Sequence, residues 1–130
     1  MSTILLVEDE ELKRTLVKAV LSRSTDPLVR EADVVDATSL AAARTRIAAD
    51  HIDLILLDMN LPDGNGLTLA RELSEANAPQ PRPTVIAVTA SVLPQDRAAA
   101  LDAGCDDFLD KPYAAADLVS VVANHLPHPL

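Results

Sequence analysis

Short aliphatic runs alternate with longer helical segments along this chain, and the alternation limits its possible folds more than any other feature. Five aliphatic runs have the length and composition of strands, and they lie at 3–7, 33–35, 53–57, 84–88 and 107–109. Each is followed by a segment with helical spacing or helix-end signals, and these lie at 10–23, 39–49, 66–76, 94–104 and 114–126. The aliphatic runs are largely uninterrupted, as is typical of strands that are buried on both faces.

Strict alternation of strands and helices predicts an α/β fold. Right-handed crossovers would join parallel strands, and the helices would cover both faces of the sheet. We therefore expect a three-layer, doubly wound sheet of five parallel strands with five helices. The second strand is the least defined element, because its start falls anywhere within 28–34.

Charge and cysteine content exclude several functional classes. The net charge of −9 argues against a surface that binds nucleic acid or an anionic membrane. Cys105 is the one cysteine and cannot form an internal disulfide, which favours a reducing, cytoplasmic location. No apolar run reaches membrane-spanning length, and the N-terminus lacks the basic region of a signal peptide. We expect one domain over residues 1–126 and a short tail over 127–130.

Polar side chains follow four of the five predicted strands. They are Glu8 and Asp9 after the first strand, Asp58 after the third, Thr89 after the fourth and Lys111 after the fifth. The second strand offers nothing obvious beyond Asp36. Because ligands bind at the carboxyl ends of strands in open parallel sheets, we expect the four sets of side chains to converge on one pocket when the second strand lies at the outside of the sheet.

The residue types at this edge point to phosphoryl transfer. Three neighbouring carboxylates repel one another, and a bound Mg²⁺ or Mn²⁺ would relieve the repulsion because these ions prefer oxygen ligands. A lysine and a hydroxyl beside a carboxylate nucleophile complete the set needed to form an acyl phosphate on Asp58. The chain has three glycines and neither a G-x-G-x-x-G motif nor a P-loop, so the phosphoryl donor must come from outside.

Four motifs occur in order along the chain: ILLVEDE, DLILLDMNLPDGNG, VIAVTA and AGCDDFLDKP. Together they span most of the sequence, and in combination they resemble the receiver domain of two-component response regulators, the fold shared with the chemotaxis regulator. The resemblance implies the flavodoxin-like strand order 2-1-3-4-5, and it makes Asp58 the phosphoacceptor. It also implies a Mg²⁺ site formed by Asp9, Asp58 and the backbone carbonyl of Asn60, with Glu8 acting directly or through water.

The same resemblance assigns further roles. It makes Thr89 the switch hydroxyl, Lys111 the lysine that contacts the phosphoryl group, and Phe108 the aromatic switch residue. Phe108 also has a simpler reading as a core residue. Asn60 and Ser91 occupy the positions that tune the lifetime of the phosphoryl group. Gly66 matches the loop glycine after the phosphoacceptor, and Pro112 forms a Lys–Pro peptide that is often cis in this family.

The implied partners are a histidine kinase or histidine phosphotransfer protein, which donates the phosphoryl group, and a downstream target protein. The target would read the surface formed by the helix at 94–104, the strand at 107–109 and the helix at 114–126. We expect a monomer or weak dimer with no nucleic-acid or membrane partner. Nothing after residue 126 resembles an output domain, which favours a stand-alone receiver; a receiver within a longer regulator or hybrid kinase is the alternative.

Three other functions fit the sequence less well. A haloacid-dehalogenase-type phosphatase uses Asp-x-Asp, but here the second position is Asn60, which cannot act as the general acid. A flavodoxin-like cofactor protein needs a phosphate-binding loop where this chain has the acidic run 8–11. A receiver that signals without phosphorylation is disfavoured by the intact pocket. We therefore expect a phosphoacceptor that assists only its own phosphorylation and dephosphorylation, not an enzyme.

Overall fold

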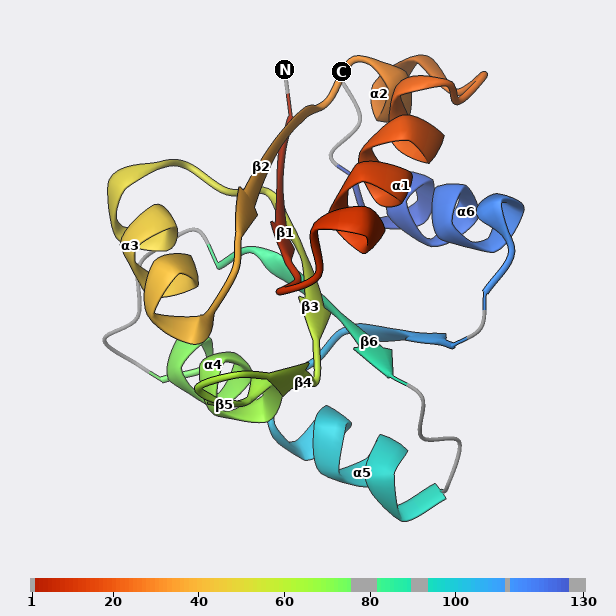
Figure 1. The fold of residues 1–130 in the computed structure, drawn as a ribbon. Coiled ribbons are helices and arrows are strands. Elements are labelled where there is room, and N and C mark those ends of the chain that lie inside the picture. Colours follow the sequence, from red (N-terminus) through yellow and green to blue (C-terminus); the bar gives the residue numbers. More distant parts are fainter. Residues whose placement is uncertain (1, 76–81, 90–93, 112, 127–130) are drawn as a thin grey trace.

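Five parallel strands form one sheet between two layers of helices in the computed structural model, which describes residues 2–75, 82–89, 94–111 and 113–126 (Figure 1). The sheet strands are β1 (Thr3–Val7), β2 (Asp33–Ala37), β3 (Leu54–Asp58), β6 (Thr84–Thr89) and β7 (Asp107–Asp110). The helices are α1 (Glu11–Ser22), α2 (Pro27–Arg30), α3 (Leu40–Ala49), α4 (Gly66–Leu73), α5 (Pro94–Asp102) and α6 (Ala115–His125). A small hairpin of β4 (Asn60–Leu61) and β5 (Gly64–Asn65) follows β3.

The strand order is β2-β1-β3-β6-β7, and all neighbouring pairs in this sheet are parallel. This confirms the predicted α/β class and the order 2-1-3-4-5. All five residues of the central strand β3 are buried, as its uninterrupted apolar run predicted. Asp58 lies opposite Val88 in the register, so β3 carries its terminal carboxylate to the same edge at which β6 ends.

Two aliphatic clusters fill the spaces between the sheet and the helices. Helices α3, α4 and α5 cover one face, and α1, α2 and α6 cover the other (Figure 1). Successive residues of β1 alternate between the two clusters because side chains alternate across a strand. The β1 residues are Leu5 and Val7 on the first face, and Ile4 and Leu6 on the second. No helix in the described part of the chain is long and apolar enough to cross a bilayer.

The expectation of five helices was wrong by one short element, since the described residues contain six. Helix α2 was missed because four residues are too few for a periodic apolar pattern. Its start is nevertheless encoded locally: the Asp26 carboxylate accepts a hydrogen bond of 2.9 Å from the Leu28 N–H, and Pro27 occupies the first turn. Val29 is 1% exposed and anchors this turn in the core.

Strand β2 also differs from its prediction, because it continues two residues beyond Val35 to Ala37. It lies at the edge of the sheet, and its burial pattern runs from exposed Asp33 to buried Ala37. An edge strand of this kind tolerates Asp36 within the pairing, whereas the sequence pattern suggested that the strand stopped before it. This extension brings the end of β2 alongside the end of β1, which becomes important for the site.

Candidate functional site

Three carboxylates meet where β1 and β3 end. Glu8 and Asp9 follow β1, and Asp58 is the last residue of β3. Each offers an oxygen atom, and the three oxygens lie within 4.8 Å of one another. Glu8 and Asp58 are only 6% and 5% exposed, whereas Asp9 is exposed. The predicted convergence of the residues after the first and third strands is therefore present in the structure.

This grouping is electrostatically unfavourable without a cation. Burial raises the pKa of the Glu8 carboxyl from 4.5 to about 7. The Glu10 N–H, which donates to Glu8 Oε2 over 3.3 Å, opposes the rise, and the negative charge of Asp58 adds to it. An all-oxygen set of carboxylates, one of them open to solvent, fits a hard divalent cation that keeps part of its water shell.

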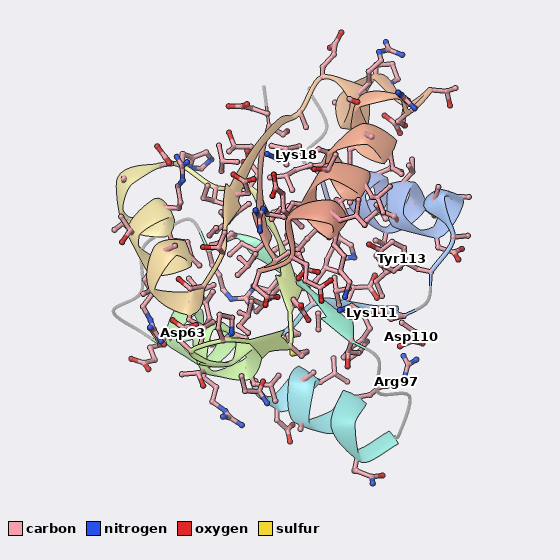
Figure 2. The ribbon with its side chains drawn as sticks, in the orientation of Figure 1. Lys18, Asp63, Arg97, Asp110, Lys111 and Tyr113 are labelled. Atoms are coloured by element: carbon pink, nitrogen blue, oxygen red, sulfur yellow. The ribbon has the colours of Figure 1, made fainter. Side chains whose placement is uncertain are left out.

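Lys111 supplies positive charge next to Asp58. Its Nζ atom lies 3.2 Å from Asp58 Oδ1, and the lysine side chain is 23% exposed. The backbone N–H of Lys111 donates to the carbonyl oxygen of Thr89 over 2.7 Å. This bond fixes the backbone of Lys111 to the end of β6. Figure 2 shows Lys111 directly after β7, at the same sheet edge as the end of β6.

Thr89 and Phe108 occupy neighbouring strands beside this centre. Thr89 is the last residue of β6 and pairs in register with Asp110 of β7. Phe108 is half-buried and packs against the core cluster that lies under α3, α4 and α5, so the simpler core reading has structural support. The Arg97 guanidinium of α5 lies over the Phe108 ring, 5.4 Å from its centroid.

The same arginine ties α5 to β7. Arg97 also forms an ion pair with the Asp110 carboxylate, and Figure 2 shows the two side chains beside each other. Asp110 Oδ1 is buried and has no hydrogen-bond partner among the described residues. Sequence reasoning gave no role to this pair, because it joins residues 13 positions apart across a helix–strand boundary.

The loop after Asp58 is held close to the phosphoacceptor strand. Met59 donates its N–H to the Val88 carbonyl over 3.3 Å and accepts from the Gly66 N–H over 3.2 Å. A Cβ atom on Gly66 would lie 2.7 Å from the Asp58 carbonyl oxygen, so this approach requires glycine. The Asn60 backbone lies in β4, two residues after Asp58. Ser91 and Pro112 fall outside the described residues.

Asp63 anchors the tip of this loop to a neighbouring helix. Its carboxylate accepts hydrogen bonds from the N–H groups of Leu40 and Ala41, over 2.9 and 3.1 Å. These bonds hold the pKa of Asp63 below its usual value, because they favour the charged carboxylate. Ser39 caps the same helix by accepting a hydrogen bond of 3.1 Å from the Ala42 N–H. The loop that carries Asn60 is thus fixed at both its base and its tip.

Cys105 lies away from this centre. The thiol is 5% exposed, and burial raises its pKa to about 11. A buried, protonated thiol is a poor nucleophile, so Cys105 acts as a small core residue.

Comparison with known protein families matches nearly the whole chain to one family. A family model described as the response regulator receiver domain matches residues 4–123. The chain is 36% identical over 121 residues to the KDP operon transcriptional regulatory protein KdpE of Escherichia coli (strain K12), covering 91% of this chain and 48% of KdpE. It is 34% identical over 126 residues to the two-component response regulator ORR41 of Oryza sativa subsp. japonica, covering 95% of this chain and 93% of ORR41. It thus spans about half of one relative and nearly all of the other.

Solved structures share the fold. The receiver domain of the sensor histidine kinase PA1611 from Pseudomonas aeruginosa PAO1 superposes with a TM-score of 0.77 at 31% identity. The match covers 95% of this chain and 96% of that chain, and that structure has a magnesium ion coordinated in its active-site cleft.

Proposed function

Because the chain belongs to the response regulator receiver domain family, we propose that it accepts a phosphoryl group on Asp58 from a phosphohistidine of a kinase or phosphotransfer protein. The observation that carries the proposal is the position of Asp58. Its nearly buried carboxylate lies within 4.8 Å of two acidic side chains and 3.2 Å from the Lys111 ammonium. One carboxylate therefore has both a candidate cation site and a fixed positive charge beside it.

Different residues of the chain would hold the metal ion and contact the phosphoryl group. Glu8, Asp9 and Asp58, together with the Asn60 carbonyl, would hold Mg²⁺ or Mn²⁺. The bound ion would neutralise charge on the phosphoryl oxygens and on the attacking carboxylate. Lys111 would place its ammonium against a phosphoryl oxygen, and the Thr89 hydroxyl would donate a hydrogen bond to another. These contacts stabilise charge that Asp58 alone could not tolerate in a buried position.

The proposed transfer exchanges one bond to phosphorus for another. An Asp58 carboxylate oxygen attacks the phosphorus in line with the P–N bond of the phosphohistidine. The new O–P bond forms as the P–N bond breaks, and the imidazole leaves with the electron pair. The product is an acyl phosphate on Asp58. Receiver domains form a two-component signalling family and not a conventional enzyme family. This chain would assist only its own phosphorylation and dephosphorylation.

A protein surface suited to the donor adjoins the site. A groove of about 610 Å³ runs between α1 and α6 and includes Glu8 and Lys111 in its lining. Leu16, which lines the groove, and Leu12 of the same helix are 57% and 72% exposed, which is unusual for large apolar residues. This apolar surface next to Asp58 supports docking by another protein, which would bring its phosphohistidine to the pocket.

Output is proposed to leave through the face formed by α5, β7 and α6. Among the described side chains of α5, only Ala100 is buried, so the helix is anchored by little apolar area. A weakly anchored helix is suited to a change of position when Asp58 gains charge. Thr89 and Phe108 would couple the two events, and Asn60 and Ser91 would set the lifetime of the phosphoryl group.

The proposal extends to the setting of the molecule. A cytoplasmic monomer or weak dimer, with residues 1–126 as the receiver and 127–130 as a tail, fits the high negative charge and the acidic pocket. Relatives include both a regulator of about twice this length and one of nearly equal length. A stand-alone receiver and a receiver within a longer regulator or hybrid kinase are both compatible with these relatives.

Phosphotransfer from a phosphohistidine tests this function. Autophosphorylated histidine kinases and phosphotransfer proteins from the source organism would be mixed with the wild-type chain and with Asp58→Asn, with Mg²⁺ present. The labelled phosphoryl group should move from a donor to the wild-type chain and not to the Asp58→Asn variant. Equal labelling of both proteins, or no labelling of the wild type by any donor, would contradict the proposal.

A further inference from the structure

A chain of side-chain contacts links the edge strand β2 to the acidic turn after β1. Asp36, the next-to-last residue of β2, accepts a hydrogen bond of 2.7 Å from Lys18 Nζ and lies 3.5 Å from Arg14 Nε. On the same guanidinium, the NH1 group of Arg14 donates to the carbonyl oxygen of Glu8 over 3.0 Å. Arg14 therefore bridges Asp36 and the peptide group that joins Glu8 to Asp9.

The backbone of Glu8 is consequently bound from two sides. Its N–H donates to the Ala37 carbonyl over 3.0 Å, and its carbonyl accepts from Arg14. The Arg14 side chain is only 16% exposed, so water competes weakly for these contacts. The side chains on either side of the bound peptide are Glu8 and Asp9, two members of the acidic cluster.

We propose that Arg14, oriented by Asp36, is a positioning residue for divalent-cation binding at the acidic cluster. The inference rests on the proposed function. Arg14 does not itself bind the ion or the phosphoryl group; it fixes the peptide from which two of the three carboxylates project. Partners that orient ligand residues in this way typically change metal affinity by about 10- to 100-fold when they are removed.

The sign of the effect separates positioning from simple electrostatics. Arg14 is a cation near the site, so its charge alone opposes the binding of a second cation. Removing that charge would tighten Mg²⁺ binding if charge were its only influence. Removing a positioning residue weakens binding instead. Lys18 is a matched control, since it lies on the same helix and its Nζ pairs with the same Asp36 carboxylate, whereas Arg14 also donates to the Glu8 carbonyl.

The test is a calorimetric titration of the full chain with Mg²⁺ and no phosphoryl donor. The Mg²⁺ dissociation constant should rise about tenfold in Arg14→Ala and about threefold in Asp36→Asn, and Lys18→Met should remain within about twofold of wild type. The double variant Arg14→Ala/Asp36→Asn should be no weaker than Arg14→Ala, because both changes act through one contact to Glu8. Arg14→Lys keeps the charge but loses the forked donor, and should be intermediate.

Wild-type or tighter Mg²⁺ binding by Arg14→Ala would overturn the inference. So would a loss in Lys18→Met as large as that in Arg14→Ala. Thermal unfolding with a chelator present checks that each variant is folded; if Arg14→Ala is not, Arg14→Lys, which keeps the charge, decides by the same criterion. If the wild type itself binds no Mg²⁺, the proposed function fails instead, so the two failures are distinguishable.

Discussion

The Lys111 ammonium lies 3.2 Å from Oδ1 of Asp58, a carboxylate that is 5% exposed. Lys111→Met should therefore remove the fixed positive charge that would meet the incoming phosphoryl group. Loss of one preorganised electrostatic contact typically slows a reaction about 10²- to 10³-fold, and we expect a loss of that size in the rate of phosphorylation by acetyl phosphate at saturating Mg²⁺. Intact-mass time courses would measure it.

The matched control for that variant is Lys13→Met. Lys13 lines the groove beside the site, but it pairs with Glu10 and is 44% exposed. Exposed pairs of this kind contribute little, so the rate should stay within about twofold of wild type. Equal losses in the two variants would mean that general positive charge, and not the contact with Asp58, is what matters.

Glu8 should make the metal-free protein sensitive to pH. Because the pKa of Glu8 is raised from 4.5 to about 7, the folded chain retains a proton that the unfolded chain has lost between these values. The free energy of unfolding therefore falls as pH rises from about 4.5 to about 7, by at most about 3 kcal/mol. Glu8→Gln should remove this loss.

Urea denaturation with a chelator would compare Glu8→Gln, wild type and Glu11→Gln across that pH range. The advantage of Glu8→Gln over wild type should grow towards pH 7, whereas Glu11→Gln, on the exposed first turn of α1, should follow wild type. If the free energy of unfolding changed with pH in the same way in all three proteins, the raised pKa of Glu8 would be contradicted.

Gly66→Ala should damage both stability and the site. The added Cβ would lie 2.7 Å from the Asp58 carbonyl oxygen, and backbone at this position cannot move aside as a flexible side chain would. We expect a loss of about 1–3 kcal/mol in the free energy of unfolding and slower phosphorylation. Thr68→Ala, at an exposed position of the same helix, is the control. A Gly66→Ala protein as stable and as reactive as Thr68→Ala would refute the close-approach argument.

Arg97→Ala should loosen α5 with little cost in global stability. The arginine contacts the Asp110 carboxylate and the Phe108 ring, but both members of the ion pair are more than one-third exposed, so the pair contributes about 0–1 kcal/mol. Hydrogen exchange of the α5 amides should be faster than in wild type. Gln95→Ala, an exposed change in the same helix, should not have this effect. Unchanged exchange in Arg97→Ala would mean that the pair does not tether the helix.

The strands of the sheet interior were predictable because burial on both faces leaves a continuous apolar signal. That signal also located the ends of β1, β3 and β6 and hence Glu8, Asp58 and Thr89. Lys111 follows β7, the other edge strand, whose short apolar run was still recognisable in the sequence. The edge strand β2 carries a weaker pattern, since one side of it meets solvent, and its extension through Asp36 was missed. Elements of two to four residues, such as α2 and the β4–β5 hairpin, are too short to show any period.

The contacts that support the site could not be predicted from the sequence pattern. Arg14 reaches the Glu8 carbonyl because α1 crosses beside the end of β2, and no local pattern specifies that crossing. Asp63 resembles an ordinary turn residue until the fold places it at the start of α3. Residues that support the site from neighbouring elements could therefore be recognised only from the tertiary structure. Residues at strand ends could be predicted from the sequence.

The central claim is that Asp58 is a Mg²⁺-dependent phosphoacceptor, and intact-mass measurement with acetyl phosphate tests it most directly. Wild type incubated with Mg²⁺ should gain the mass of one phosphoryl group, and peptide mapping should place it on Asp58. The gain should be absent with a chelator and absent in Asp58→Asn. A phosphoryl group that still appears on Asp58→Asn, or that forms equally well without a divalent cation, would contradict the account.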